Sequence, residues 1–193
     1  MRKIEFSDII QYDDYIKIRE KYLKKIIEIR KNRRIQVGEY ITFVFENRET
    51  VLYQIQEMIR LEKMRDEVLI KNEIEIFNRL VPDKNELCAT MFIEIFERGF
   101  IKSLHYKFAG IHENRIFLKF GDESITPEFE PEVLSNQRVS AVNYLKFKFI
   151  NEQVKKFLDR NVPTFIEINH NDYQAIAKLP QNVRESLIKD LTV

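Results

Sequence analysis

The stretch Phe43-Val-Phe-Glu-Asn-Arg-Glu-Thr-Val-Leu-Tyr-Gln-Ile-Gln-Glu-Met-Ile-Arg-Leu-Glu62 decides the fold, because a strand-like run passes directly into an amphipathic helix. Asn47 stands at the junction and is a good N-cap, and Glu49 lies where a first-turn acid favours the helix dipole. We therefore predict that a strand ends near Phe45 and that a helix runs from about Arg48 to Lys63.

Toward the N-terminus, residues 35–37 and 40–45 are rich in β-branched and aromatic side chains and flank Gly38, which predicts a β-hairpin. Residues 14–33 precede the hairpin and form a predicted amphipathic helix. Its apolar stripe consists of Ile16, Leu23, Ile26 and Ile27, with lysines on the opposite face.

Toward the C-terminus, apolar periodicity and capping residues predict alternating clusters of helices and strands. The predicted helices are 67–79 (capped by Asp66), 98–108, 151–159, 172–178 and 180–191; the predicted strands are 87–96, 115–120, 139–150 and 164–168, with a loop at 122–137. The strand 87–96 is nearly all apolar and is expected at the centre of a sheet. We predict an α+β fold: a single domain over 1–193 with a mixed, mainly antiparallel sheet packed against several amphipathic helices.

The composition excludes several classes of protein. The 32 basic and 31 acidic residues nearly cancel, so net charge favours neither a nucleic acid nor an anionic membrane as partner. The lone Cys88 excludes an internal disulfide and indicates a reducing, cytoplasmic compartment. No apolar run approaches the roughly 20 residues that a bilayer requires. The composition is compatible with a homo-oligomer.

Two carboxylates fall where apolar side chains belong. At about 100° per residue, Glu62 lies in the middle of the apolar face of the 48–63 helix, and Glu73 lies at the centre of the stripe of the next helix. An ionised carboxylate buried alone costs several kcal/mol, so we expect arginine or a cation beside them, with Arg30 and Arg34 as available partners. Three interpretations stay open: a structural ion-pair network, a pocket for an anion or a metal, or a helix phase that differs from the ideal one.

The candidate charged cluster therefore collects the polar residues of this region. It comprises Arg30, Arg34, Glu46, Asn47, Arg48, Gln54, Glu57, Arg60, Glu62 and Glu73. No catalytic residue, metal ligand or cofactor is assigned, because phosphate-binding and hydrolase motifs are absent and the three histidines lack zinc-like spacing. The basic stretch 24–34 could contact nucleic acid, but the acids that interrupt it favour a solvated helix face.

Several motifs together resemble the domain-of-unknown-function family 3501. They are Arg33-Arg34-Ile-Gln-Val-Gly38, Phe45-Glu-Asn-Arg-Glu-Thr50, Gln54-Ile-Gln-Glu-Met-Ile-Arg60 with Glu62, and Ala89-Thr90 with Glu94, and the likeness extends over nearly the whole chain. The resemblance implies an uncharacterised bacterial protein, often encoded beside rubrerythrin-like and iron–sulfur oxidoreductase genes. It thereby implies a redox protein partner and a link to oxidative stress, but no activity.

One departure from the family pattern bears on mechanism. Where the family is expected to show His-Phe-Leu-Arg-Phe, this chain has Asn143-Tyr-Leu-Lys-Phe147. An amide can form hydrogen bonds but cannot titrate as histidine does, which argues against a histidine-dependent reaction.

The leading hypothesis is a non-enzymatic accessory protein with a structural or binding site in 46–62. The alternatives are an enzyme or a metal- or anion-binding protein that uses Glu57, Glu62 and Glu73 with Arg48 or Arg60, and a nucleic-acid-binding module.

Overall fold

The protein is described by a computed structural model over residues 1–94, 108–130 and 140–192. Its helices are α1 (Tyr12–Lys31), α2 (Arg48–Leu61), α3 (Glu67–Phe77), α5 (Asn151–Leu158) and α6 (Gln181–Leu191), with short 3-10 turns η1 (Phe6–Asp8) and η2 (Asn78–Leu80). Its strands are β1 (Arg34–Val37), β2 (Ile41–Glu46), β3 (Glu86–Ile93), β4 (Ile116–Phe120), β5 (Glu123–Ile125), β6 (Glu128–Phe129), β7 (Val142–Lys148), β8 (Thr164–His170) and β9 (Tyr173–Lys178).

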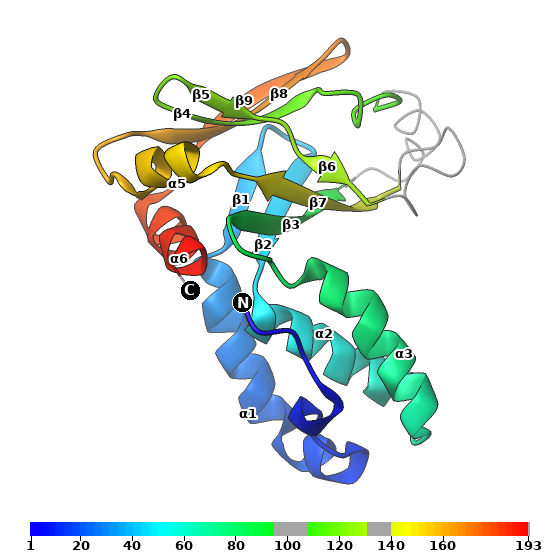
Figure 1. Cartoon of the computed structure of the whole chain (residues 1–193). Coiled ribbons are helices and arrows are strands. Elements are labelled where there is room, and N and C mark those ends of the chain that lie inside the picture. The colour runs from blue at the N-terminus through cyan, green and yellow to red at the C-terminus, as the bar shows by residue number, and fades with distance from the viewer. Residues whose placement is uncertain (95–107, 131–139, 193) are drawn as a thin grey trace.

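Two antiparallel sheets form the body of the molecule, with the orders β1-β2-β3-β7-β6 and β5-β4-β8-β9. One large apolar core joins both sheets, as in the buried side chains Phe45, Phe147, Leu118 and Ile166. α5 and α6 lie beside the sheets and add Phe157 and Leu187 to this core (Figure 1). The α+β class is confirmed, and β3 has the central position predicted for 87–96.

Helices α1, α2 and α3 lie together and extend away from the two sheets (Figure 1). We call these three helices the helical arm. A second, smaller core lies inside it, where Val51, Ile55 and Ile59 of α2 pack against Ile70 and Ile74 of α3. Spacings of four along each helix place these side chains on one face, so α2 and α3 bury their stripes against each other.

The predicted local signals are present in the structure. The Asn47 side chain accepts a hydrogen bond from the Thr50 backbone N–H and caps α2, and Asp66 caps α3. Gly38 takes a φ of +70° in the β1–β2 hairpin, a region that disfavours side chains with a Cβ. These features depend on neighbours three or four residues away, which is why the sequence predicts them.

Two predictions about the C-terminal half are wrong. Residues 172–178, predicted as a helix, contain β9, which pairs with β8 because alternate side chains from Tyr173 onward face the core. The predicted loop 122–137 contains two short strands, β5, which pairs with the preceding strand β4, and β6, which pairs with β7. Most of the predicted helix 98–108 lies outside the described residues.

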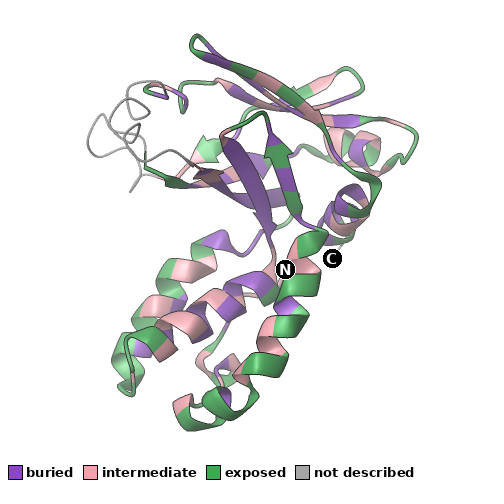
Figure 2. Cartoon of the chain, turned by 180° about the vertical axis from the view of Figure 1, so that it is seen from behind, coloured by how far each residue is buried: buried purple, intermediate pink, exposed green. Residues whose placement is uncertain are grey.

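The phase of α1 also differs from the prediction. Tyr15 and Ile26 are buried against the rest of the arm, whereas Ile16 and Ile27 are about half exposed. Figure 2 shows this helix largely green on its outer side. The helix is therefore oriented by its contacts with α2, and the apolar stripe read from the sequence lies at the edge of the buried face.

Candidate functional site

The candidate cluster does not form one site. Its residues divide among the start of α2, the interface between α1 and α2, the edge of the five-stranded sheet and the outer part of the arm.

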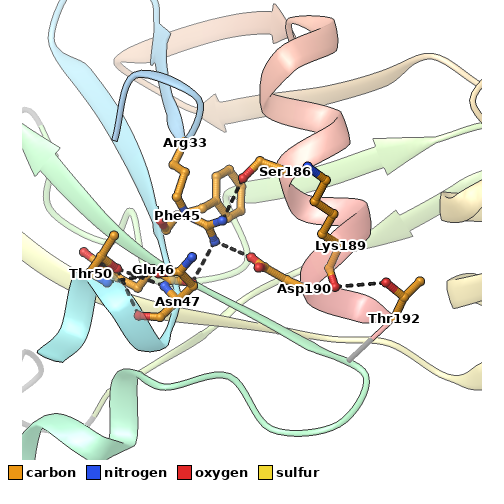
Figure 3. Close-up of polar contacts among 9 residues, drawn as sticks. All are labelled: Arg33, Phe45, Glu46, Asn47, Thr50, Ser186, Lys189, Asp190 and Thr192. Atoms are coloured by element: carbon orange, nitrogen blue, oxygen red, sulfur yellow. Dashed lines mark hydrogen bonds and ion pairs between the residues drawn. The ribbon is translucent and has the colours of Figure 1, made fainter. Parts of the chain in front are cut away.

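Arg33 belongs to the basic stretch 24–34, for which the sequence favours a solvated helix face. In the structure it is 1% exposed and joins three elements (Figure 3). Its Nε donates to the Phe45 carbonyl at 2.7 Å and its Nη1 to Ser186 Oγ at 2.8 Å. Its Nη2 donates to the Glu46 carbonyl at 3.0 Å and forms a buried ion pair with Asp190 of α6. Burial raises the pKa of Asp190, and the nearby guanidinium opposes this rise.

Glu46 is 2% exposed, and its carboxylate is bound by hydroxyl groups instead of arginine. Thr50 Oγ1 donates to it at 2.5 Å and Thr90 Oγ1 at 2.7 Å, while Thr50 Oγ1 also accepts from the Asn47 backbone N–H at 2.9 Å. This arrangement ties the end of β2 to β3 and to the first turn of α2. The structure thus buries Glu46 and places it beside the half-buried Asn47.

Glu57 forms the strongest cluster of the predicted charges. Arg19 donates to both of its carboxylate oxygens at 2.8 Å, Tyr15 Oη donates at 2.8 Å and Arg60 Nη2 at 3.0 Å. These hydrogen bonds, chiefly that of Arg19, lower the pKa of Glu57 to about 2 although burial opposes them. A general acid or base works best with a pKa near the working pH. The group is therefore suited to holding α1 against α2.

Three further predicted residues lie on α1 and α2. The Arg30 guanidinium lies 5.4 Å from the centre of the Tyr53 ring, a cation–π distance. Arg48 pairs with Asp8 at 2.5 Å and so ties the N-terminal segment to α2. The Gln54 amide nitrogen is buried without a hydrogen-bond partner among the described residues.

The expectation that Glu62 points into the core is wrong. Glu62 is exposed as the C-cap residue of α2, because the helix continues beyond its last buried side chain, Ile59. Glu73 is half-buried at the flank of α3, whose buried face is centred on Ile70 and Ile74. Within 1–94, 108–130 and 140–192, neither glutamate makes an ion pair.

Arg34 pairs with Glu94 at 2.8 Å at the edge of the five-stranded sheet, away from both glutamates. Lys25 and Lys31 pair with Glu49 and Glu28. With Arg33 buried as well, the basic stretch 24–34 does not form a continuous unopposed cationic surface. This arrangement does not favour the nucleic-acid interpretation.

The remaining reactive side chains have structural surroundings. Burial raises the pKa of the Cys88 thiol, which disfavours the reactive thiolate. A His170 ring nitrogen lies 2.7 Å from the Ala109 carbonyl, and His105 lies outside the described residues. Among the described residues, no group of three or more His, Cys, Asp and Glu side chains could hold a metal ion.

Sequence reasoning missed Arg33 and Asp190 as a buried pair. They are 157 residues apart, and no local pattern signals such a contact. None of the described helices combines the length and the apolar character needed to cross a bilayer.

A family model and a solved structure each match nearly the whole chain. The family model described as "Protein of unknown function (DUF3501)" matches residues 3–191. A crystal structure of a protein of unknown function from Burkholderia pseudomallei K96243 is similar, with a TM-score of 0.92 and 28% sequence identity over 98% of this chain and 100% of that one. No curated protein is similar enough to this chain to count as a match.

Proposed function

We propose that this chain, which belongs to the DUF3501 family of proteins of unknown function, is a non-enzymatic accessory protein that binds a partner protein through its helical arm. The observation that carries this proposal is where its exposed apolar side chains lie. Seven of the ten large apolar side chains that are exposed among the described residues belong to the arm: Ile16, Ile18, Ile27, Leu61, Val68, Leu69 and Ile76.

The outer face of α3 is the strongest part of this surface. Val68 and Leu69 are 65% and 53% exposed, Ile76 lies two turns further along, and Leu61 at the end of α2 is 61% exposed. Scattered apolar side chains are ordinary on a protein surface, but several on one helix face are typical of a protein interface. We call Val68, Leu69 and Ile76 the α3 face.

The charges beside the α3 face indicate the chemistry of its partner. Glu73 and Glu75 lie on its two sides, and neither makes an ion pair with any residue that the structure describes. A partner segment with apolar side chains bordered by lysine or arginine would satisfy both the apolar face and the free carboxylates.

The arm is also held in shape before any partner binds. Glu57 ties α1 to α2, and Arg65 binds Asp13 across the tip with two hydrogen bonds of 3.0 Å. A preformed surface loses less conformational entropy on association, which favours binding.

The redox association implied by the family resemblance suggests rubrerythrin-like and iron–sulfur proteins as the first partners to test. An enzyme site built on the Glu/Arg cluster is less well supported, because Glu57 is saturated with donors and Glu62 is exposed.

The experiment is a binding titration of the purified chain against each of these redox proteins by biolayer interferometry. Val68→Lys with Leu69→Lys places positive charge on the α3 face, and we expect affinity to fall by about tenfold or more, as for the loss of an interface hot spot. Ile176→Lys on β9 is the matched control, because Ile176 is equally exposed but lies on the body.

Two results would contradict the proposal. Equal binding by the arm variant and the wild-type chain would show that the α3 face is not the interface. An absence of binding to any of the redox proteins at about 100 µM would remove the redox association, since weak specific complexes are still detected at that concentration.

A further inference from the structure

A cavity of about 550 Å³ lies on the body of the molecule, where the α5–β8 connection, the end of β9 and the start of α6 meet. Its lining includes Arg160, Val162, Thr164, Lys178, Gln181 and Arg184. The volume falls within the range of roughly 300–1,000 Å³ that is typical of small-molecule sites. None of these residues belongs to the helical arm, so the cavity is independent of the function proposed above.

Arg184 in this cavity is a buried cation that makes no ion pair within the described part of the chain. It is 7% exposed, and its Nη2 donates to the Phe157 and Asp159 carbonyls at 2.7 Å. Its Nη1 donates to the Val162 carbonyl and to Thr164 Oγ1, and its Nε has no hydrogen-bond partner among the described residues. All of these acceptors are neutral, so hydrogen bonds hold the guanidinium in place, and the Asp159 and Glu185 carboxylates act on its charge only through space.

The charges at the rim leave the cavity positive. Arg160 and Glu185 neutralise each other in a two-point ion pair with distances of 2.7 and 3.1 Å. Lys178 at the end of β9 makes no ion pair within the described part of the chain. The lining therefore holds three cations, Arg160, Lys178 and Arg184, against one carboxylate, Glu185, which leaves a net excess of about two positive charges.

The start of α6 adds a backbone donor to the same cavity, because Gln181 is one of its lining residues. Pro180 is the N-cap residue and provides no side-chain hydrogen bond, and the first intrahelical bond runs from the Arg184 N–H to the Pro180 carbonyl at 2.9 Å. The N–H groups of Gln181, Asn182 and Val183 precede that bond and are the ones a helix leaves without intrahelical partners. Together with the helix dipole, they favour an anion at this position.

We propose that this cavity binds a small phosphate-bearing ligand. The phosphate would lie against the first turn of α6 within reach of Lys178, with the Arg184 charge beneath it. Arg184 supplies the electrostatic field, because its Nη donors are already used, while Lys178 and the Gln181 N–H group supply the hydrogen bonds.

The test is a titration of the full chain with inorganic phosphate and with pyrophosphate at constant ionic strength, followed through the backbone amide resonances of residues 181–183. We expect saturable shifts at these amides, with pyrophosphate binding more tightly. Lys178→Gln should weaken binding about tenfold through the loss of one charge-assisted hydrogen bond. Gln181→Pro should weaken it by several-fold, because proline at the first helical position keeps the helix but removes one N–H donor.

Lys155→Gln on α5 is the matched control, since Lys155 is exposed and lies outside the cavity lining. Shifts that do not saturate, or equal weakening by Lys155→Gln and Lys178→Gln, would show general ionic attraction and overturn the proposal. Saturable binding that Gln181→Pro and Lys178→Gln leave unchanged would place the anion elsewhere and overturn it as well.

Discussion

Neutralising Glu57 should loosen the contact between α1 and α2 in a pH-dependent way. Glu57→Gln keeps the size and shape of the side chain but removes the charge that Arg19, Arg60 and Tyr15 hold. The pKa of Glu57 is about 2 in the folded chain against an ordinary value of 4.5. That difference corresponds to about 3 kcal/mol of folding free energy at neutral pH.

Partial exposure of the ion pair to solvent reduces this free energy. The Glu57 side chain is 15% exposed and Arg19 is 35% exposed, so the arginines regain some hydration when the carboxylate is lost. We therefore expect Glu57→Gln to lower the free energy of unfolding by about 2 kcal/mol at pH 7.

The sign of the pH dependence follows from the lowered pKa. The stabilisation is complete well above 4.5, the ordinary pKa of the unfolded chain, and is lost as the pH falls toward about 2. The difference in the free energy of unfolding between wild type and variant should decrease by about a quarter at pH 4 and by more than half at pH 3.

The assay is urea unfolding followed by circular dichroism between pH 7 and pH 3. Glu62→Gln is the matched control on the same helix, because Glu62 is exposed; its effect should stay within about 0.5 kcal/mol. A loss below about 0.5 kcal/mol for Glu57→Gln at pH 7, or a loss that does not change with pH, would refute this account of the α1–α2 contact.

Three further predictions concern the body of the molecule. Arg33→Met should cost about 3–5 kcal/mol in urea unfolding because it leaves Asp190 buried without its partner; a cost below about 1 kcal/mol would show that the pair is hydrated. Gly38→Ala should destabilise by about 2 kcal/mol or more, measured as a lower Tm, because Gly38 has a φ of +70° and an added Cβ would lie 2.2 Å from Tyr173 Oη; an unchanged Tm would contradict this geometry. Cys88 should react with a maleimide only after unfolding, because burial raises its pKa, and rapid labelling of the native protein, followed by mass spectrometry, would contradict this.

The sequence predicted features that depend on close neighbours. The Asn47 and Asp66 caps, the Gly38 hairpin and the nearly continuous apolar run of β3 were all recognisable, since each rests on contacts within a few residues or on a strong periodicity. The α+β class follows from the same signals.

The strand β9 shows where local patterns fail. Its residues fit a helix about as well as a strand, and only the adjacent edge of β8 decides between them through backbone hydrogen bonds. The prediction that Glu62 is buried failed for a similar reason. The packing partner of a helix sets which part of its apolar stripe is buried, and Glu62 lies beyond that part of α2.

The sequence by itself determined the caps, the hairpin, the order of most elements and the α+β class, because those depend on backbone geometry and on periodicity along the chain. Only the tertiary structure decided which charges are buried and with whom. Arg33 meets Asp190, and Glu57 meets Arg19, across long separations in sequence. The free energy of a buried charge depends on the donors that folding brings around it, and no local segment contains that information.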